Sequence, residues 1–213
     1  MDDSLQDVCL IGLAGQSCSG KNVVAAILQE RGFSIIDADE VSRTVLHQHT
    51  AALIHRYERA AAKNGIVLRT DAGILNTRAL GKLLFADTEL LAAHEAYILP
   101  KIEREIWQRI YANIAKNPAR PIVLKAPTLH KTCFLHRCRF ILYVEAPYLI
   151  RFFRCKKRDK LRVSEIFFRF LRQKNFFSQY LIRNADDIIR IRNWGSVKQL
   201  ERIISRILMQ KGL

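Results

Sequence analysis

Short apolar runs alternate with stretches of helical spacing at the start of the chain. The runs at residues 8–13 and 33–36 are continuous, which is typical of strands that a sheet buries on both faces. Between them, apolar residues recur at helical spacing over residues 23–27, and Gly32 predicts the end of that helix. Strand, turn, helix and strand in this order form a βαβ unit, which predicts a parallel sheet with helices on both faces.

The rest of the chain continues this α/β pattern. Residues 39–117 are predicted to be mostly helical, with Pro100 as a boundary or a kink. Strand character returns at residues 121–125, 140–144 and 188–191. Further helices are expected at residues 148–157 and 197–209. The chain has no internal repeat and no low-complexity linker, so we predict one domain.

A glycine-rich motif separates the first strand from the first helix. It consists of Gly15, Gln16, Ser17, Cys18, Ser19, Gly20, Lys21 and Asn22, and it matches G-x-x-x-x-G-K. Glycines let the backbone curl so that its N–H groups point at phosphate oxygens, and the helix start adds the positive end of its dipole. Lys21 can then neutralise charge on the β- and γ-phosphates. An ordinary strand-to-helix turn is the alternative, but the setting between strand and helix favours phosphate binding.

Two neighbouring positions bear on catalysis. Asn22 stands where the motif normally has Ser or Thr to hold magnesium, and because an amide oxygen can ligate a hard cation, Asn22 is our candidate metal ligand. Asp37 and Asp39 follow the second strand, at the sheet edge where α/β proteins bind ligands. We expect one of them to cap the next helix and the other to act on an attacking hydroxyl.

The chain resembles the dephospho-CoA kinase family. The resemblance is carried by IGLAGQSCSGK at residues 11–21 and GFSIIDADEVSR at residues 32–43, and weaker matches follow in order to residues 193–196. It implies a P-loop NTPase-type three-layer α/β/α fold with a five-stranded parallel sheet, a helical substrate-binding subdomain and a lid. The implied boundaries are about 6–45, 119–157 and 184–213 for the core, 46–118 for the CoA-binding subdomain and 158–183 for the lid.

The resemblance also implies a reaction, in which the γ-phosphate of ATP moves to the ribose 3′-hydroxyl of dephospho-CoA with Mg²⁺ present. Asp39 matches the family's proposed base. Lys21, Arg154 and Arg158 would stabilise the charge of the transition state, with Arg154 also binding the nucleotide. Asn193 falls in the matching C-terminal loop and is a further candidate for nucleotide binding.

Four positions depart from the family's pattern. Asn22 replaces the magnesium-binding Ser or Thr, and Leu99 stands where a His usually precedes the proline. Lys125 replaces the acid at a strand end, and His130 lies in the same altered segment. These changes could weaken magnesium binding, or Lys125 could supply part of the metal's charge. The alternative function is therefore a degenerate relative that binds nucleotide or CoA without catalysis.

Composition indicates the class of protein and where it is expected to be found. The chain has 213 residues, of which 49% are hydrophobic and 26% charged, which is typical of a globular protein. No apolar run reaches the roughly 18 residues of a membrane span, and the acidic start is unlike a signal peptide, so we expect a cytoplasmic protein. The five cysteines are scattered without a Cys-x-x-Cys pair, which predicts neither a disulfide framework nor a zinc site.

The net charge of +15 is concentrated near the C-terminus, where residues 151–213 carry 17 Lys and Arg against 5 Asp and Glu. Residues 158–183 mix basic and aromatic side chains, as nucleic-acid or anionic-membrane surfaces do. A lid helix whose arginines face ATP is the interpretation we favour. The predicted partners are therefore ATP and dephospho-CoA rather than nucleic acid, and the pattern does not indicate an oligomeric state.

Overall fold

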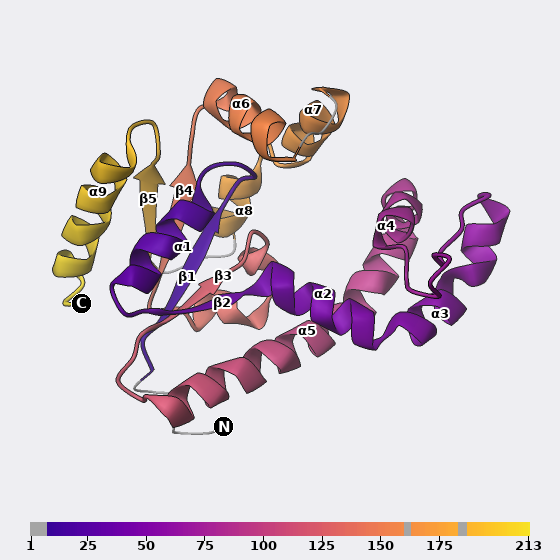
Figure 1. Ribbon diagram of the computed structural model, residues 1–213, viewed down its shortest axis with the longest axis horizontal. Coiled ribbons are helices and arrows are strands. Elements are labelled where there is room, and N and C mark those ends of the chain that lie inside the picture. Colours follow the sequence, from indigo (N-terminus) through magenta and orange to yellow (C-terminus); the bar gives the residue numbers. More distant parts are fainter. Residues whose placement is uncertain (1–7, 160–162, 183–186) are drawn as a thin grey trace. The chain divides into compact units, whose positions relative to one another are not determined.

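The computed structural model describes most of the chain, namely residues 8–159, 163–182 and 187–213 (Figure 1). The remaining residues are 1–7, 160–162 and 183–186. Residues 6–7 and 184–186 belong to the ends of the predicted core, residues 160–162 and 183 belong to the predicted lid, and the predictions made for them lie outside the described part.

The chain divides into two compact units. Met1–Asp37 and Ile110–Leu213 form the first unit, and Ala38–Arg109 forms the second. The role of the second unit in binding CoA, and that of residues 158–183 as a lid, stay predictions.

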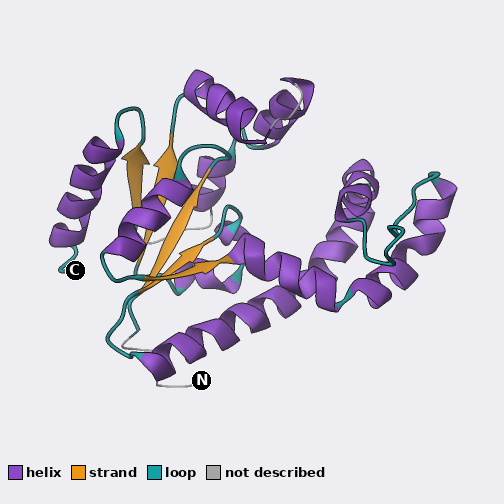
Figure 2. Ribbon diagram, viewed as in Figure 1, coloured by secondary structure: helices purple, strands orange, loops and turns teal. Residues whose placement is uncertain are grey.

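The first unit is built on a parallel sheet (Figure 2). Its strands are β1 (Leu10–Gly15), β2 (Ser34–Asp37), β3 (Ile122–Lys125), β4 (Phe140–Glu145) and β5 (Ile188–Arg192). They are ordered β2-β3-β1-β4-β5, and every neighbouring pair is parallel. The five-stranded parallel sheet predicted from the apolar runs is confirmed, with strand ends shifted by at most two residues.

The remaining elements of this unit are helices. They are α1 (Lys21–Glu30), α6 (Tyr148–Asp159), α7 (Val163–Arg172), α8 (Phe176–Ile182), α9 (Val197–Gln210) and the short 3-10 helices η2 (Leu129–Lys131) and η3 (Cys133–His136). Among the described residues, none of the helices has the length and apolar character needed to cross a bilayer.

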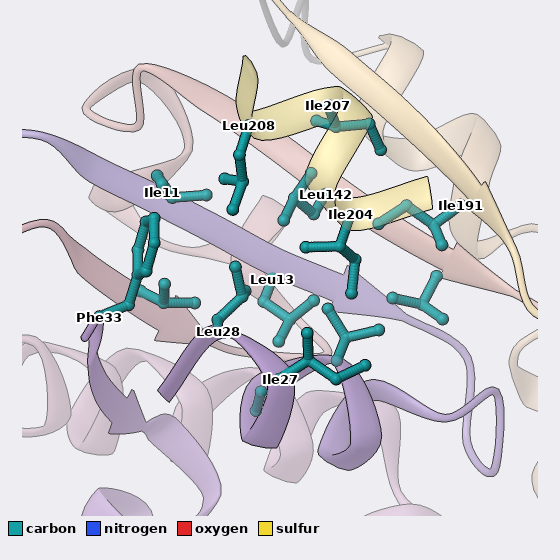
Figure 3. Close-up of a cluster of buried hydrophobic side chains, with 14 of the residues drawn as sticks. Ile11, Leu13, Ile27, Leu28, Phe33, Leu142, Ile191, Ile204, Ile207 and Leu208 are labelled. Atoms are coloured by element: carbon teal, nitrogen blue, oxygen red, sulfur yellow. The ribbon is translucent and has the colours of Figure 1, made fainter. Parts of the chain in front are cut away.

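One face of the sheet packs against α1 and α9 (Figure 3). Alternate residues of β1, Ile11 and Leu13, are both fully buried on this face, as the two-residue period of a strand requires. They meet Leu28 of α1 and Ile204 of α9 in the same apolar cluster. This packing fixes the end of β1 and the body of α1, and therefore both ends of the loop between them.

The opposite face is covered by α8. The ring of Tyr143 in β4 makes edge contacts with Phe177 and Tyr180, and the Tyr180 hydroxyl donates a hydrogen bond of 2.9 Å to the carbonyl of Pro127. Helices on both faces complete the predicted three-layer α/β/α arrangement.

The second unit is helical. It contains α2 (Ala38–Gln48), α3 (Thr50–Lys63), α4 (Thr77–Ala86) and most of α5 (Thr88–Lys116). Pro100 lies inside α5, so of the two alternatives the helix boundary is wrong, and the kink stays a prediction. A proline removes one backbone hydrogen bond, and burial of Ile98, Ile102 and Ile106 on both sides of it keeps the apolar stripe of the helix continuous.

Candidate functional site

The loop between β1 and α1 has a backbone that only glycine permits at two positions. Gly15 has φ 137° and Gly20 has φ 105°. A Cβ atom would overlap the Val144 carbonyl at Gly15 and the Asn193 side-chain amide at Gly20. Gly15 is therefore required by close approach to the backbone of β4, and Gly20 by its positive φ and the nearby side chain of Asn193, which follows β5.

Side chains from outside the loop bind its carbonyl oxygens. Arg151 donates from Nε to the Ser17 carbonyl at 2.9 Å. The Ser19 carbonyl accepts from Asn193 Nδ2 at 2.8 Å and from Arg154 Nη1 at 3.3 Å. In a planar trans peptide, C=O and N–H point in opposite directions. The amides that share these peptides, those of Cys18 and Gly20, therefore point away from the three side chains.

Gln173 binds the loop at Gln16 and Ser17. Its Oε1 accepts a hydrogen bond of 2.8 Å from the Ser17 amide, and its Nε2 donates to Ser17 Oγ at 2.9 Å. Its carbonyl accepts from Gln16 Nε2, also at 2.9 Å. The segment that follows α7, part of the predicted lid, is thereby joined to the phosphate loop by three hydrogen bonds.

Arg151 was missed by the sequence analysis. Its side chain is 4% exposed, and its guanidinium carbon lies 4.0 Å from the ring centroid of Phe170. Burial lowers the pKa of Arg151 from 12.5 to about 10, which leaves the side chain charged at neutral pH. Its spacing from Arg154 and Arg158 along one helix face is the signal that could have identified it.

A disulfide joins the loop to α6. It links Cys18, whose φ of 60° is the only positive value among the described non-glycine residues, to Cys155. Both cysteines are buried, together with Ile166 and Phe170 of α7. The sequence analysis expected no disulfide, and this is a correction. The partners are 137 residues apart, so neither cysteine count nor local spacing could reveal that the fold brings them together.

Lys21 lies against the loop. Its ammonium donates to the carbonyls of Gly15 at 2.8 Å and Gln16 at 2.9 Å. Ser19 Oγ is fully buried and has no hydrogen-bond partner within the described part of the chain.

Lys125 lies at the carboxyl end of β3, next to Asn22 in the first turn of α1. Its ammonium forms an ion pair of 2.6 Å with Asp37 and donates to Asn22 Oδ1 at 3.0 Å. Magnesium takes about six oxygen ligands, whereas these two oxygens already bind a cationic group. Within the described ranges, no group of three or more His, Cys, Asp or Glu side chains could hold a metal ion. The residues present therefore do not fit a protein-held magnesium ion.

A family model for dephospho-CoA kinase matches residues 9–199 of the chain. The chain belongs to the dephospho-CoA kinase family. The dephospho-CoA kinase of Treponema denticola is 46% identical over 210 residues, which cover 99% of this chain and 93% of that protein. The enzyme of Treponema pallidum is 41% identical, with 98% and 99% covered. The resemblance inferred from the sequence is thus confirmed.

Solved structures show the same fold. TT1252 from Thermus thermophilus has a TM-score of 0.72 at 26% identity, covering 95% of this chain and 97% of its own. A dephospho-CoA kinase from Campylobacter jejuni has a TM-score of 0.60 at 19% identity, with 96% and 97% covered, and shares the fold. The predicted P-loop NTPase fold class is confirmed.

The other residues proposed from the dephospho-CoA kinase family lie as follows. Asp39 is exposed in the first turn of α2, two residues after the ion-paired Asp37. Arg158 is exposed in the last turn of α6. Leu99 is half-buried in α5. His130 is buried against the rings of Phe176 and Tyr180, so this departure from the family serves the packing of α8.

Two cavities are lined in part by residues that bind the loop. One, of about 380 Å³, is lined by Gln16, Tyr148, Arg151, Phe167, Phe170, Leu171 and Lys174. The other, of about 260 Å³, is lined by Arg192, Asn193, Trp194, Gly195, Ser196, Gln199, Leu200 and Ile203. Both share a residue with the set that binds the loop, Arg151 in one case and Asn193 in the other.

Proposed function

We propose that this chain is a dephospho-CoA kinase, which transfers the γ-phosphoryl group of ATP to the ribose 3′-hydroxyl of dephospho-CoA. The observation that carries the proposal is the phosphate loop, with its carbonyls at Ser17 and Ser19 bound from outside, in a chain that matches the family model over residues 9–199. The products are ADP and coenzyme A. Location in the cytoplasm remains a prediction.

The loop supports the binding of the triphosphate. The amides of Cys18 and Gly20 point away from Arg151 and Asn193, and amides at the start of a helix are good donors to phosphate oxygens. Lys21 would leave its two carbonyl partners for the β- and γ-phosphates and neutralise charge there. The cavity beside Asn193 would take the adenine, since Trp194 offers it an aromatic surface.

The chemistry needs a proton acceptor and fixed positive charge. The 3′-oxygen attacks the γ-phosphorus, its proton passes to the Asp39 carboxylate, and the bond to the β-phosphate oxygen breaks to release ADP. Arg154 and Arg158 would bind the phosphate oxygens in the transition state. Because Asn22 Oδ1 already accepts a hydrogen bond from Lys125, the residues here give magnesium no ready site, and the proposed reaction assigns it no step.

The test is ADP release measured in a coupled assay with and without dephospho-CoA. We expect release that depends on the acceptor and that falls about 10²–10⁴-fold in kcat in Asp39→Asn, with ATP affinity nearly unchanged. Asp71→Asn, an exposed acid of the same unit, is the matched control. ATP binding without acceptor-dependent ADP release would contradict the proposal and favour a non-catalytic relative.

A further inference from the structure

We propose that Lys125 is a fixed cation of the nucleotide site, which binds the terminal phosphates directly and makes ATP binding independent of a divalent cation. The inference rests on the proposed function, because it requires a triphosphate on the loop. It concerns the position at which P-loop proteins generally use a hydroxyl and an acid to hold magnesium.

The sheet topology brings Lys125 to this position. Strand β3 lies between β2 and β1, and Lys125 pairs in register with Asp37 on one side and with Leu13 on the other. Leu13 lies two residues before Gly15, where the loop begins. The carboxyl end of β3 is therefore adjacent to the loop, and its last side chain reaches the first turn of α1 at Asn22.

The contacts of Lys125 keep its ammonium in place. The side chain is only 13% exposed, although a lysine normally extends into water. Asp37 and Asn22 accept two of the three hydrogen bonds that an ammonium can donate. The third can be donated to a phosphate oxygen. Because the two acceptors lie within 3.0 Å of a positive charge, a metal ion would meet repulsion and occupied oxygens there.

A purely structural role gives a different expectation. If the ion pair with Asp37 only joins the ends of β2 and β3, replacing Lys125 should lower stability and leave the affinity for ATP unchanged in any metal condition. If Lys125 binds phosphate, replacing it should lower the affinity for ATP most in the absence of metal, when no metal ion neutralises the triphosphate.

The experiment measures the dissociation constant for ATP by calorimetry, once with EDTA and once with excess Mg²⁺. We expect wild-type protein to bind ATP in EDTA within about fivefold of its affinity in Mg²⁺, because a hydrogen bond from the Lys125 ammonium is worth about tenfold or more and offsets most of the loss of the metal's charge. Lys125→Gln should bind about tenfold more weakly in EDTA, with a smaller loss in Mg²⁺. Lys125→Arg, which keeps the charge, should retain most of the metal-free affinity.

Lys198→Gln is the matched control, because Lys198 is exposed on α9 and should leave both constants unchanged. Thermal melting shows that each variant is folded. A reverse variant, Asn22→Thr with Lys125→Asp, restores a hydroxyl and an acid and should make ATP binding depend on Mg²⁺ by at least about tenfold.

Two outcomes would overturn the inference. One is a folded Lys125→Gln variant that binds metal-free ATP as tightly as wild type, and the other is a wild-type protein that binds ATP only with Mg²⁺. In both cases the proposed function stands if the remaining binding is lost in Lys21→Ala. Wild-type protein that binds ATP under neither condition would refute the proposed function itself, and the inference with it.

Discussion

Gly20 is the residue of the loop whose replacement would disturb the contact between the loop and Asn193. Its φ of 105° is unfavourable for any other residue, and a side chain would also overlap the Asn193 amide that binds the Ser19 carbonyl. We predict that Gly20→Ala loses most of its ATP affinity and about 1–3 kcal/mol of stability, measured by calorimetry and urea unfolding.

The variant Gly32→Ala separates the effect of a positive φ from the effect of overlap with Asn193. Gly32 has a similar φ of 90°, but a Cβ atom there would meet nothing within 4 Å. It should lose stability and keep its ATP affinity. Equal loss of affinity in both variants would show that the close approach of Asn193 to the loop does not matter.

His94 predicts a pH-dependent stability of the helical unit. It is buried, 3.1 Å from the Tyr57 hydroxyl, and burial lowers its pKa from 6.5 by disfavouring the charged imidazole. Below the usual histidine pKa the unfolded chain therefore binds more protons than the folded one. Stability should fall as the pH is lowered from about 7.5 to about 5.

Urea unfolding at the two pH values checks this. His94→Gln should show a weaker dependence, while His55→Gln, which removes an exposed histidine, should behave as wild type. A pH dependence that is unchanged in His94→Gln would contradict the assignment.

At the scale of elements, α6 attaches to the loop through Arg151, Arg154 and Cys155. Arg151→Met removes the hydrogen bond to the Ser17 carbonyl and the one of 2.6 Å to Gln16 Oε1. We predict that its ATP affinity falls by about tenfold or more, because the loop peptides lose their orientation. Arg206→Met, on the exposed side of α9, should bind ATP as wild type does, and equal binding by both variants would refute this role.

The disulfide between Cys18 and Cys155 predicts a difference between oxidised and reduced protein. A cross-link over 137 residues restricts the unfolded chain, so reduction should lower stability by about 2–4 kcal/mol. Urea unfolding with and without a reductant measures this, and peptide mapping identifies the bond. Cys155→Ser should resemble the reduced wild type, and Cys133→Ser should still respond to the reductant. An insensitive wild type would contradict the bond.

The elements themselves were largely predictable. The apolar runs gave the five strands because a parallel sheet buries them on both faces, and G-x-x-x-x-G-K placed the loop because its mechanism needs that spacing. The contacts that Arg151 and Gln173 make with the loop could not be predicted in the same way, since they join residues more than 130 positions apart. Pro100 does not end the helix, because packing on both sides outweighs the lost hydrogen bond.

At the scale of the whole molecule, we predict that the first unit binds ATP and that turnover also requires the second unit. The residues that bind the loop all lie in the first unit, so its ATP affinity should survive changes confined to the second. We predict that Asp39→Asn and Leu99→Ala bind ATP normally in calorimetry, while turnover depends on the second unit. A large loss of ATP affinity in both variants would contradict this division.

The most direct test of the central claim follows the phosphoryl group itself. ATP labelled in its γ-phosphate is incubated with dephospho-CoA, and the products are separated and analysed for the label. The proposed function predicts one label in the 3′-phosphate of coenzyme A for each ADP formed, and none in Lys21→Ala. Label that appears only as inorganic phosphate, or at another position of the acceptor, would contradict it.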